Sequence, residues 1–326
     1  MRSWKLIDKE ELKLCEENQK ENLISDDTSK IKTKYVSISE IDLNMYRQGA
    51  LKQPITLGRS AVGIISESKT NQFLKGQKVF VSPYRKDRFD RLKISGIDFD
   101  GTLQDFIYVP NSAIEILPDD NILFDTQAIY IDDIALAIET LNKINLKKGD
   151  VIIFVGISSK NCIAAQIAIM MQAVPIIIDK SKEKLEIANN LGIYYTVLQN
   201  GKASQEINKI TSGRGGKFII FNSDCFQDVG ESITHFIENN GVVCFMGFNS
   251  IINGEVLDIS TIINKQITIM TSKTGENQFK KAINMLANRY LKFDGLLNNF
   301  IDFENVDKSF KSLSKSCNYL KNTVKC

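Results

Sequence analysis

The stretch from Leu146 to Gly192, LKKGDVIIFVGISSKNCIAAQIAIMMQAVPIIIDKSKEKLEIANNLG, decides the fold of this chain. Residues 151–155 within it form an uninterrupted apolar run, mostly of β-branched residues. Such a run is typical of a strand that is buried on both faces of a parallel sheet. Gly156 ends the run and predicts a tight turn after the strand.

A helix and a second strand are expected to follow this turn. Ser158 or Ser159 can cap a helix over residues 161–171, and residues 174–178 form the next apolar run, which ends on Asp179. A further helix, capped by Ser181, follows. Strand, glycine turn, helix, strand and acid is the order of a dinucleotide-binding unit, in which the helix N-terminus faces a pyrophosphate and the acid accepts from a ribose hydroxyl.

The glycine fingerprint of such units, G-x-G-x-x-G, is altered here. The corresponding residues read GISSKN, so that Gly156 remains while Ser158 and Asn161 stand at the second and third glycine positions. Asp179 nevertheless lies at the expected distance of about twenty residues from the turn. The pattern therefore predicts either a working dinucleotide site or a doubly wound domain that has lost its ligand.

The composition excludes several classes of protein. The chain has 326 residues, a net charge of +2 and 43% hydrophobic residues, which predicts two domains and no basic field for nucleic acid. The longest near-apolar stretch, residues 163–178, is interrupted by Gln166, Gln172 and Pro175, so no membrane span is expected. Six scattered cysteines and a single histidine predict a cytoplasmic protein with reduced thiols and no clustered zinc ligands.

The element pattern changes along the chain. Short strand candidates fill the first third, including residues 32–37, 58–66, 77–84 and 101–110, which favours a β-barrel-like or sandwich domain. From about residue 126, strands alternate with helices, with further strands expected at residues 218–221, 242–246 and 266–271. This alternation predicts a doubly wound parallel α/β sheet. The last segment, from about residue 273, can rejoin the first domain.

Several segments, taken in order, resemble motifs of the medium-chain dehydrogenase/reductase superfamily, which includes the zinc-type alcohol dehydrogenases. They are IDLNMYRQG (residues 41–49), LGRSAVGII (57–65), GTLQDFIYVP (101–110), NLKKGDVIIFVG (145–156) and NNGVVCFMG (239–247). The resemblance implies a Rossmann-type dinucleotide-binding domain over residues 127–272. It implies a β-rich, GroES-like catalytic domain over residues 1–126 and 273–326, and a homodimer joined near residues 266–271.

The residues that match the family's catalytic zinc ligands depart from the pattern. They are Ser39, Arg59 and Asp132, and Ile41 replaces the residue that relays the alcohol proton. Because arginine stays protonated, we expect no zinc, although a zinc enzyme with unusual ligands is the remaining alternative. We expect an ion pair between Arg59 and Asp132 in the former metal pocket. This pair either fills the pocket or leaves Arg59 to polarise a substrate carbonyl or hold a phosphate or carboxylate.

The same resemblance implies the cofactor residues. Gly156, Ser158 and Ser159 form the pyrophosphate turn, and Asp179 favours NAD over NADP by repelling a 2′-phosphate, a preference that Lys180 could soften. Strand-end residues at the sheet edge where a nicotinamide would lie are Asn222, Gly247 and Thr271.

Two functions remain open from the sequence. One is a zinc-independent, NAD(P)-dependent oxidoreductase that moves a hydride to or from a small carbonyl, a polyol-like alcohol or an activated alkene. In this case Arg59 or Ser39 would act as electrophile or hydrogen-bond donor. The other is a catalytically silent dehydrogenase-fold protein that serves in binding or regulation.

Overall fold

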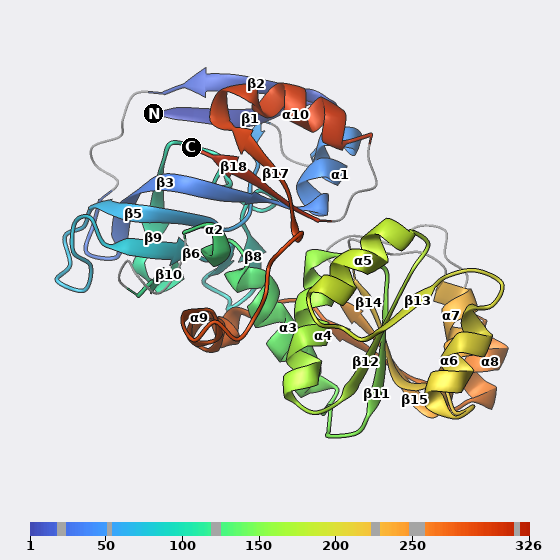
Figure 1. The fold of residues 1–326 in the computed structure, drawn as a ribbon. Coiled ribbons are helices and arrows are strands. Elements are labelled where there is room, and N and C mark those ends of the chain that lie inside the picture. Colours follow the sequence, from blue (N-terminus) through green and yellow to red (C-terminus); the bar gives the residue numbers. More distant parts are fainter. Residues whose placement is uncertain (18–23, 51–53, 119–124, 223–228, 248–257, 316–319) are drawn as a thin grey trace. The chain divides into compact units, whose positions relative to one another are not determined.

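The chain folds into two units in a computed structural model that describes residues 1–17, 24–50, 54–118, 125–222, 229–247, 258–315 and 320–326 (Figure 1). The first unit comprises Met1–Asp132, Phe279–Arg289 and Leu297–Cys326, and the second comprises Asp133–Gln278 and Tyr290–Leu296. The sequence places these boundaries at residues 126/127 and 272/273. It also assigns residues 290–296 to the first unit, whereas their contacts are with the second.

The first unit is built on β3 (Thr28–Ile38), the central strand of a seven-stranded sheet. This strand pairs with β5 on one side, and on the other side with β9 along its first half and with β18 along its last residues. The other strands of the unit are β1 (Arg2–Asp8), β2 (Glu11–Glu16), β4 (Ile55–Thr56), β5 (Ala61–Glu67), β6 (Lys78–Val81), β7 (Tyr84–Lys86), β8 (Leu92–Ile94), β9 (Phe106–Pro110), β10 (Ile114–Ile116), β17 (Leu297–Asp302) and β18 (Lys321–Lys325). This confirms the β-rich domain and the return of the C-terminal segment to it.

Four helices accompany these sheets, namely α1 (Glu40–Gln48), α2 (Asp125–Ala128), α9 (Phe279–Ala287) and α10 (Val306–Leu313). Helices α1 and α10 come from opposite ends of the chain and pack together, with the rings of Tyr46 and Phe310 at 5.6 Å in an edge-on arrangement. Both rings are almost fully buried. The contact therefore fixes α1, and with it the segment that precedes α1, against the C-terminal part of the unit.

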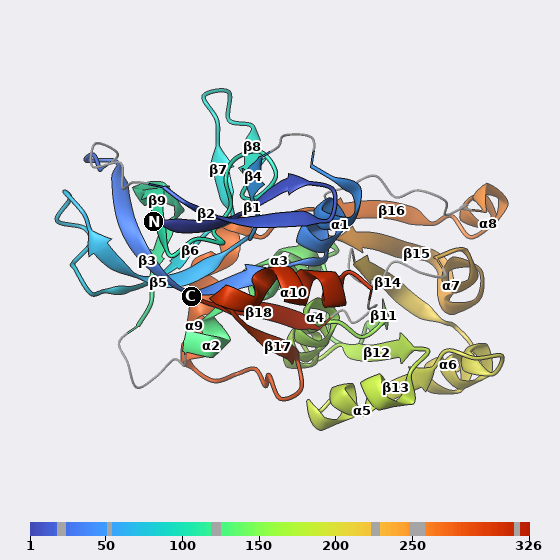
Figure 2. The same ribbon diagram turned by 90° about the horizontal axis from the view of Figure 1, so that it is seen from above.

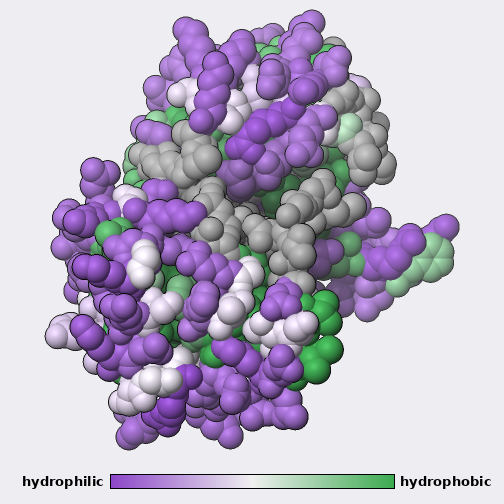
Figure 3. All heavy atoms as spheres, turned by 90° about the vertical axis from the view of Figure 1, so that its right-hand side faces the viewer, coloured by the Kyte–Doolittle hydropathy of each residue, from purple (hydrophilic) through white to green (hydrophobic). Residues whose placement is uncertain are grey.

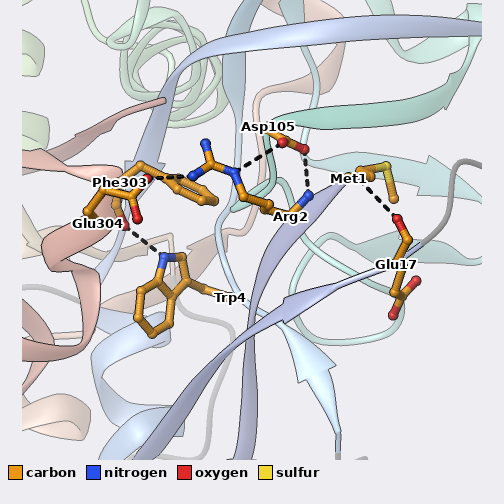
Figure 4. Close-up of polar contacts among 7 residues, drawn as sticks. All are labelled: Met1, Arg2, Trp4, Glu17, Asp105, Phe303 and Glu304. Atoms are coloured by element: carbon orange, nitrogen blue, oxygen red, sulfur yellow. Dashed lines mark hydrogen bonds and ion pairs between the residues drawn. The ribbon is translucent and has the colours of Figure 1, made fainter.

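The sequence did not predict the N-terminal hairpin of β1 and β2, because the many charged residues of this segment obscure the alternation of apolar and polar residues that is typical of a strand. Trp4 Nε1 donates to the carbonyl of Phe303 at 2.8 Å, and Arg2 pairs with both Asp105 and Glu304 (Figure 4). Burial of the indole ring and its satisfied N–H hold the hairpin to the C-terminal segment of the same unit.

The second unit contains a six-stranded, fully parallel sheet in the order β13-β12-β11-β14-β15-β16. Its strands are β11 (Val151–Val155), β12 (Val174–Asp179), β13 (Tyr195–Leu198), β14 (Gly216–Asn222), β15 (Ile237–Met246) and β16 (Thr268–Ser272). The order reverses direction between β11 and β14, and β13 and β16 form the two edges (Figure 2). In doubly wound sheets a ligand binds at this reversal, at the carboxyl ends of the strands.

Helices complete the second unit: α3 (Ile131–Lys143), α4 (Ser159–Met170), α5 (Lys182–Asn190), α6 (Ala203–Thr211), α7 (Val229–Phe236) and α8 (Ile259–Asn264). The face shown in Figure 3 is largely hydrophilic, in keeping with a lysine-rich surface. No helix among the described residues is long and apolar enough to cross a membrane.

Three expected helices differ from the structure. The helix expected over residues 127–144 is divided into α2 and α3, and the helix over 277–291 is shortened to α9 with the 3-10 turn Glu276–Gln278 before it. The helix over 229–238 stops at Phe236, because Ile237 already pairs with Gly216 as the start of β15. In this last case strand pairing overrides the apolar pattern of the helix.

Candidate functional site

In the turn after β11, only the first residue has a backbone conformation that requires glycine. Gly156 has φ +83°, which is strained for other residues. Ser158 instead lies in the extended region, with φ −144° and ψ 165°, and is the N-cap of α4. Of the two serines predicted as possible caps, Ser158 is therefore the one that caps α4. Its backbone conformation does not require glycine.

The side chains that replace the two glycines point into the protein. Ser158 Oγ accepts from the backbone N–H of Asn161 and from Nδ2 of Asn222, both at 3.1 Å. Asn161 Nδ2 donates to the carbonyls of Val155 at 2.9 Å and Gly156 at 2.8 Å. Ser158, Asn161 and Asn222 are all fully buried. The substitutions thus brace the turn from inside.

The carboxylate of Asp179 links the second strand to this turn. Its Oδ2 accepts from the N–H of Ile157 at 2.7 Å, and its Oδ1 accepts from the N–H of Ser181 at 2.8 Å. Ser181 is also the N-cap of α5, as expected. A carboxylate offers about four lone-pair sites, so two backbone donors leave capacity for further hydroxyl donors.

A second carboxylate that the sequence did not single out supports the first turn of α4. Asp133 is buried, and its Oδ2 accepts from Ser159 Oγ at 3.1 Å. Asp133 follows the predicted metal-ligand position Asp132 directly, and adjacent acids in a helix point in different directions. The sequence shows the two adjacent acids, but it does not show that Asp133 binds Ser159 while Asp132 has a different partner.

The remaining predicted cofactor residues are less closely connected. Lys180 is exposed, and Gly247, with φ +75°, follows β15 and donates from its N–H to the carbonyl of Ser272. Thr271 is exposed, and its carbonyl accepts from Lys143 Nζ at 2.7 Å. The structure therefore brings Gly156, Ser158, Asp179 and Asn222 into one network, while Thr271 lies one residue before the end of its strand.

In the first unit, Ser39 is the N-cap of α1. Its Oγ donates to Asp42 Oδ2 at 2.7 Å, and the N–H of Ser39 donates to the same oxygen at 2.8 Å, which completes a capping box. Asp42 Oδ1 accepts from the N–H of Gly58 at 2.9 Å, so the buried carboxylate ties α1 to the segment that carries Arg59. The hydroxyl proton of Ser39 is thus directed to a carboxylate of its own unit.

Arg59 is buried, with 5% of its surface exposed, on a segment held by close backbone contacts. Gly58 precedes it with φ +95°, and a Cβ on the facing Gly101 would lie 2.3 Å from the carbonyl oxygen of Leu57. The Arg59 carbonyl accepts from Thr102 Oγ1 at 3.0 Å, and Arg59 Nη1 donates to the carbonyl of Ser95 at 3.0 Å.

The expected ion pair between Arg59 and Asp132 is not formed. No ion pair among the described residues includes Arg59, whose guanidinium binds the Ser95 carbonyl instead. Asp132 is half-buried at the end of the unit's first segment, and its Oδ2 accepts from Tyr84 Oη at 3.4 Å. The sequence did not predict either partner, because the Ser95 carbonyl and the Tyr84 hydroxyl are uncharged and a search for opposite charges cannot find them.

The three matched ligand positions do not fit a zinc ion. Arg59 stays protonated, and Ser39 is occupied in its capping box, so Asp132 is the only ordinary ligand type of the three. Within the parts of the chain that the structure describes, no group of three or more histidine, cysteine, aspartate or glutamate residues is arranged to hold a metal.

Comparison with known proteins agrees with this architecture. A family model described as "Alcohol dehydrogenase GroES-like domain" matches residues 25–119, and one described as "Zinc-binding dehydrogenase" matches residues 162–288. An uncharacterized zinc-type alcohol dehydrogenase-like protein of Haemophilus influenzae is 26% identical over 316 residues, covering 91% of each chain.

Solved structures show the same fold. Galactitol-1-phosphate dehydrogenase from Escherichia coli superposes with a TM-score of 0.87 at 18% identity, covering 100% of both chains. An alcohol dehydrogenase from Escherichia coli CFT073, complexed with NADH, superposes with a TM-score of 0.86 at 19% identity, covering 100% of this chain and 99% of the other. The two family models over residues 25–119 and 162–288, with the likeness to the Haemophilus influenzae protein along nearly the whole chain, show that the chain belongs to the medium-chain dehydrogenase/reductase superfamily of oxidoreductases.

Proposed function

We propose that the protein is an NAD-dependent oxidoreductase that works without zinc and moves a hydride to or from a small carbonyl or polyol-like alcohol. The observation that carries the proposal is the Asp179 carboxylate, held by the N–H groups of Ile157 and Ser181 at the carboxyl edge of the parallel sheet. This is the position at which an acid in such folds accepts from a ribose hydroxyl.

The residues of the turn fit a dinucleotide. Ser158 and Asn161 bond to the turn's own atoms rather than projecting outward, so they leave the outer face of the turn to the backbone. The first N–H groups of a helix have no acceptor within the helix and attract an anion. Ser159 and Lys160 occupy these first positions of α4. The backbone N–H groups of these two residues would face the pyrophosphate. The bound nicotinamide would supply or accept the hydride.

The preference for NAD over NADP follows from charge. A 2′-phosphate would be placed next to the Asp179 carboxylate, and like charges repel, so NADH is expected to bind more tightly than NADPH. The exposed Lys180 beside it can reduce this difference. We therefore propose NAD as the main cofactor, with NADP as the weaker one.

Arg59 is the residue that we propose for activating the substrate oxygen. It is the buried cation on the segment where members of this family carry a zinc ligand, and its guanidinium donates to a neutral carbonyl rather than to a carboxylate. A guanidinium keeps its charge and has five donors, so one bond to Ser95 leaves others for a carbonyl, carboxylate or phosphate oxygen. Polyol-type substrates are favoured by the likeness to galactitol-1-phosphate dehydrogenase.

The test is hydride transfer measured at 340 nm, with the purified protein, NADH and a panel of small ketoses, aldehydes and activated alkenes. The proposal expects turnover with at least one carbonyl substrate, unchanged by treatment with a chelator. NADH binding without turnover on any panel member would instead favour the second function, a catalytically silent binding or regulatory protein. The internal bracing of the turn by Ser158 and Asn161 is the observation that keeps this second function open.

A homodimer joined along β16 is also proposed. Among the strands of the described residues this edge strand pairs with β15 alone, and Ile269 on it exposes 42% of its surface. Exposed apolar side chains on the neighbouring α8, Ile259 and Ile263, add to the same edge of the second unit. Light scattering should give twice the chain mass, and Ile269→Lys should give the monomer mass. Tyr194→Lys, which changes an exposed residue just before the opposite edge strand β13, is the control and should remain dimeric.

A further inference from the structure

A cavity of about 290 Å³ lies within the first unit. Its lining includes Lys5 of β1, Arg85 of β7, Phe99, Gln104, and Tyr108 of β9. Met1 and Glu17, at the open end of the N-terminal hairpin, form another part of its wall and are joined by a backbone hydrogen bond (Figure 4). The volume suits a small metabolite rather than a dinucleotide.

Arg85 is the unusual residue in this lining. Its Nε is buried and has no hydrogen-bond partner, and no ion pair or hydrogen bond of its guanidinium is found among the described residues. The guanidinium instead lies over the ring of Phe99, 4.1 Å from the ring centroid. A buried donor without an acceptor has lost its hydration with no hydrogen bond in return, which destabilises the fold, and the more so when the group is charged.

The charge of Arg85 persists at neutral pH. Burial lowers the pKa of its guanidinium to about 10, well above the pH of the cell. The guanidinium is therefore a positive charge with which no carboxylate of the described residues forms an ion pair.

The other charged groups at the cavity already have partners. Lys5 Nζ is paired with Glu17, and Asp100 Oδ1 accepts from the N–H of Thr56 at 2.8 Å. Asp100 is exposed, so water screens its charge. With the α-amino group of Met1, these groups carry two positive and two negative charges, so among the described residues that line the cavity the charge without an ionic partner is that of Arg85.

We propose that this cavity binds a small anion with a planar or tetrahedral oxygen group, a carboxylate or a phosphate, through the guanidinium of Arg85. A guanidinium presents parallel N–H donors that match two oxygens of such a group, and Phe99 holds the guanidinium plane in place. An anion would supply the acceptor that Arg85 Nε lacks. The site needs no dinucleotide and is built entirely from residues of the first unit.

The experiment follows thermal unfolding of the full-length protein, without dinucleotide, as inorganic phosphate or succinate is added at constant ionic strength with sodium chloride. At least one of the two anions is expected to raise the unfolding temperature by several degrees at millimolar concentration. A response to phosphate only or to succinate only identifies which oxygen group the cavity takes. The absence of any rise beyond that of chloride would overturn the proposal.

Three variants locate the effect. Arg85→Gln should raise the dissociation constant at least tenfold, and Arg85→Lys, which keeps the charge but loses the fork, should raise it less. Arg88→Gln is the matched control, because Arg88 is an exposed arginine of the same hairpin segment, stacked on Phe89, and does not line the cavity. An anion response that is the same in Arg85→Gln as in the unchanged protein would contradict the assignment. Since no NADH is present, failure here is distinct from failure of the proposed oxidoreductase activity.

Discussion

Asp179 Oδ2 accepts a hydrogen bond from the backbone N–H of Ile157 at 2.7 Å, which joins the end of β12 to the turn after β11. The same carboxylate caps the entry to α5 through the N–H of Ser181. One side chain therefore organises the two loops that surround the expected position of the adenosine ribose.

Replacing Asp179 by asparagine should affect both stability and binding. The asparagine amide can accept with one oxygen only, so one of the two backbone N–H donors would lose its partner, at a cost of about 1–3 kcal/mol. NADH affinity should fall, and the gap between NADH and NADPH should narrow because the repelling charge is gone. Denaturant unfolding and titration with both cofactors measure these effects.

Asp150→Asn is the matched control for this change. Asp150 is also a turn carboxylate of the second unit, which accepts from the N–H of Lys147 and from Lys217 Nζ. The Asp150→Asn variant should be somewhat less stable than the unchanged protein but should keep the preference for NADH over NADPH. An unchanged cofactor preference in Asp179→Asn would contradict the ribose assignment.

Restoring a glycine at Ser158 tests whether the altered fingerprint limits the cofactor. Glycine is nearly as good an N-cap as serine, so the change of cap residue by itself should cost only a few tenths of a kcal/mol. Removal of the Oγ also takes one acceptor from two buried donors, the N–H of Asn161 and Nδ2 of Asn222, which should lower the free energy of unfolding by about 1–3 kcal/mol more. Because the Oγ points into the protein, NADH affinity measured by calorimetry should change little, and a several-fold gain would show that the altered fingerprint limits cofactor binding. The same change at Ser181, the N-cap of α5, is the control and should bring no gain in affinity.

Arg59→Gln should impair carbonyl reduction without impairing the binding of NADH. Glutamine can keep a hydrogen bond to the Ser95 carbonyl, which limits the loss of stability, but it lacks the positive charge. NADH affinity should stay within twofold, while kcat for carbonyl reduction should fall at least a hundredfold. Arg47→Gln provides the comparison, because Arg47 is also a partly buried arginine of the first unit, bonded to the Ser314 carbonyl. Equal losses of activity in the two variants would show that Arg59 acts through the fold alone.

Two buried thiols predict a dependence of stability on alkaline pH. Burial raises the pKa of Cys162 and of Cys244 to about 12, well above the ordinary value for a thiol. A raised folded-state pKa contributes stability that is complete below the unfolded value, near 8.5, and is lost as the pH rises toward 12. Both thiols should resist iodoacetamide at pH 8, whereas the half-buried Cys15 should react. Alkylation of Cys162 before unfolding, detected by peptide mass spectrometry, would contradict this.

The sequence predicted the second unit closely because its signals are local. The apolar run of β11, its terminal glycine and the serine caps of α4 and α5 each depend on a few neighbouring residues. The structure gives β11 its expected bounds, whereas α4 begins two residues earlier and ends one residue earlier than the helix expected over residues 161–171. The parallel strand order followed from the alternation of strands and helices. Asp179 was predicted correctly as the acid at the end of its strand, but its bond to Ile157 depends on a contact across the sheet edge.

The first unit was less predictable because its contacts join distant parts of the chain. The β1–β2 hairpin is held by Trp4 against Phe303, and nothing in the charged N-terminal sequence indicates that partner. Arg59 was expected to pair with the opposite charge of Asp132, yet it binds a neutral carbonyl on the β8 side. Charge matching in the sequence cannot reveal such a bond. The segment 85–92 was expected to be an exposed excursion, whereas β7 brings Arg85 into a cavity wall.

The most direct test of the proposed function is thermal unfolding of the purified protein with millimolar NADH, millimolar NADPH or neither. A ligand at a hundredfold excess over its dissociation constant adds about 2.7 kcal/mol, which raises the unfolding temperature by several degrees in a chain of this size. The account predicts a clear rise with NADH and a smaller one with NADPH. No rise with either cofactor would contradict it and would leave a dehydrogenase fold that binds no dinucleotide.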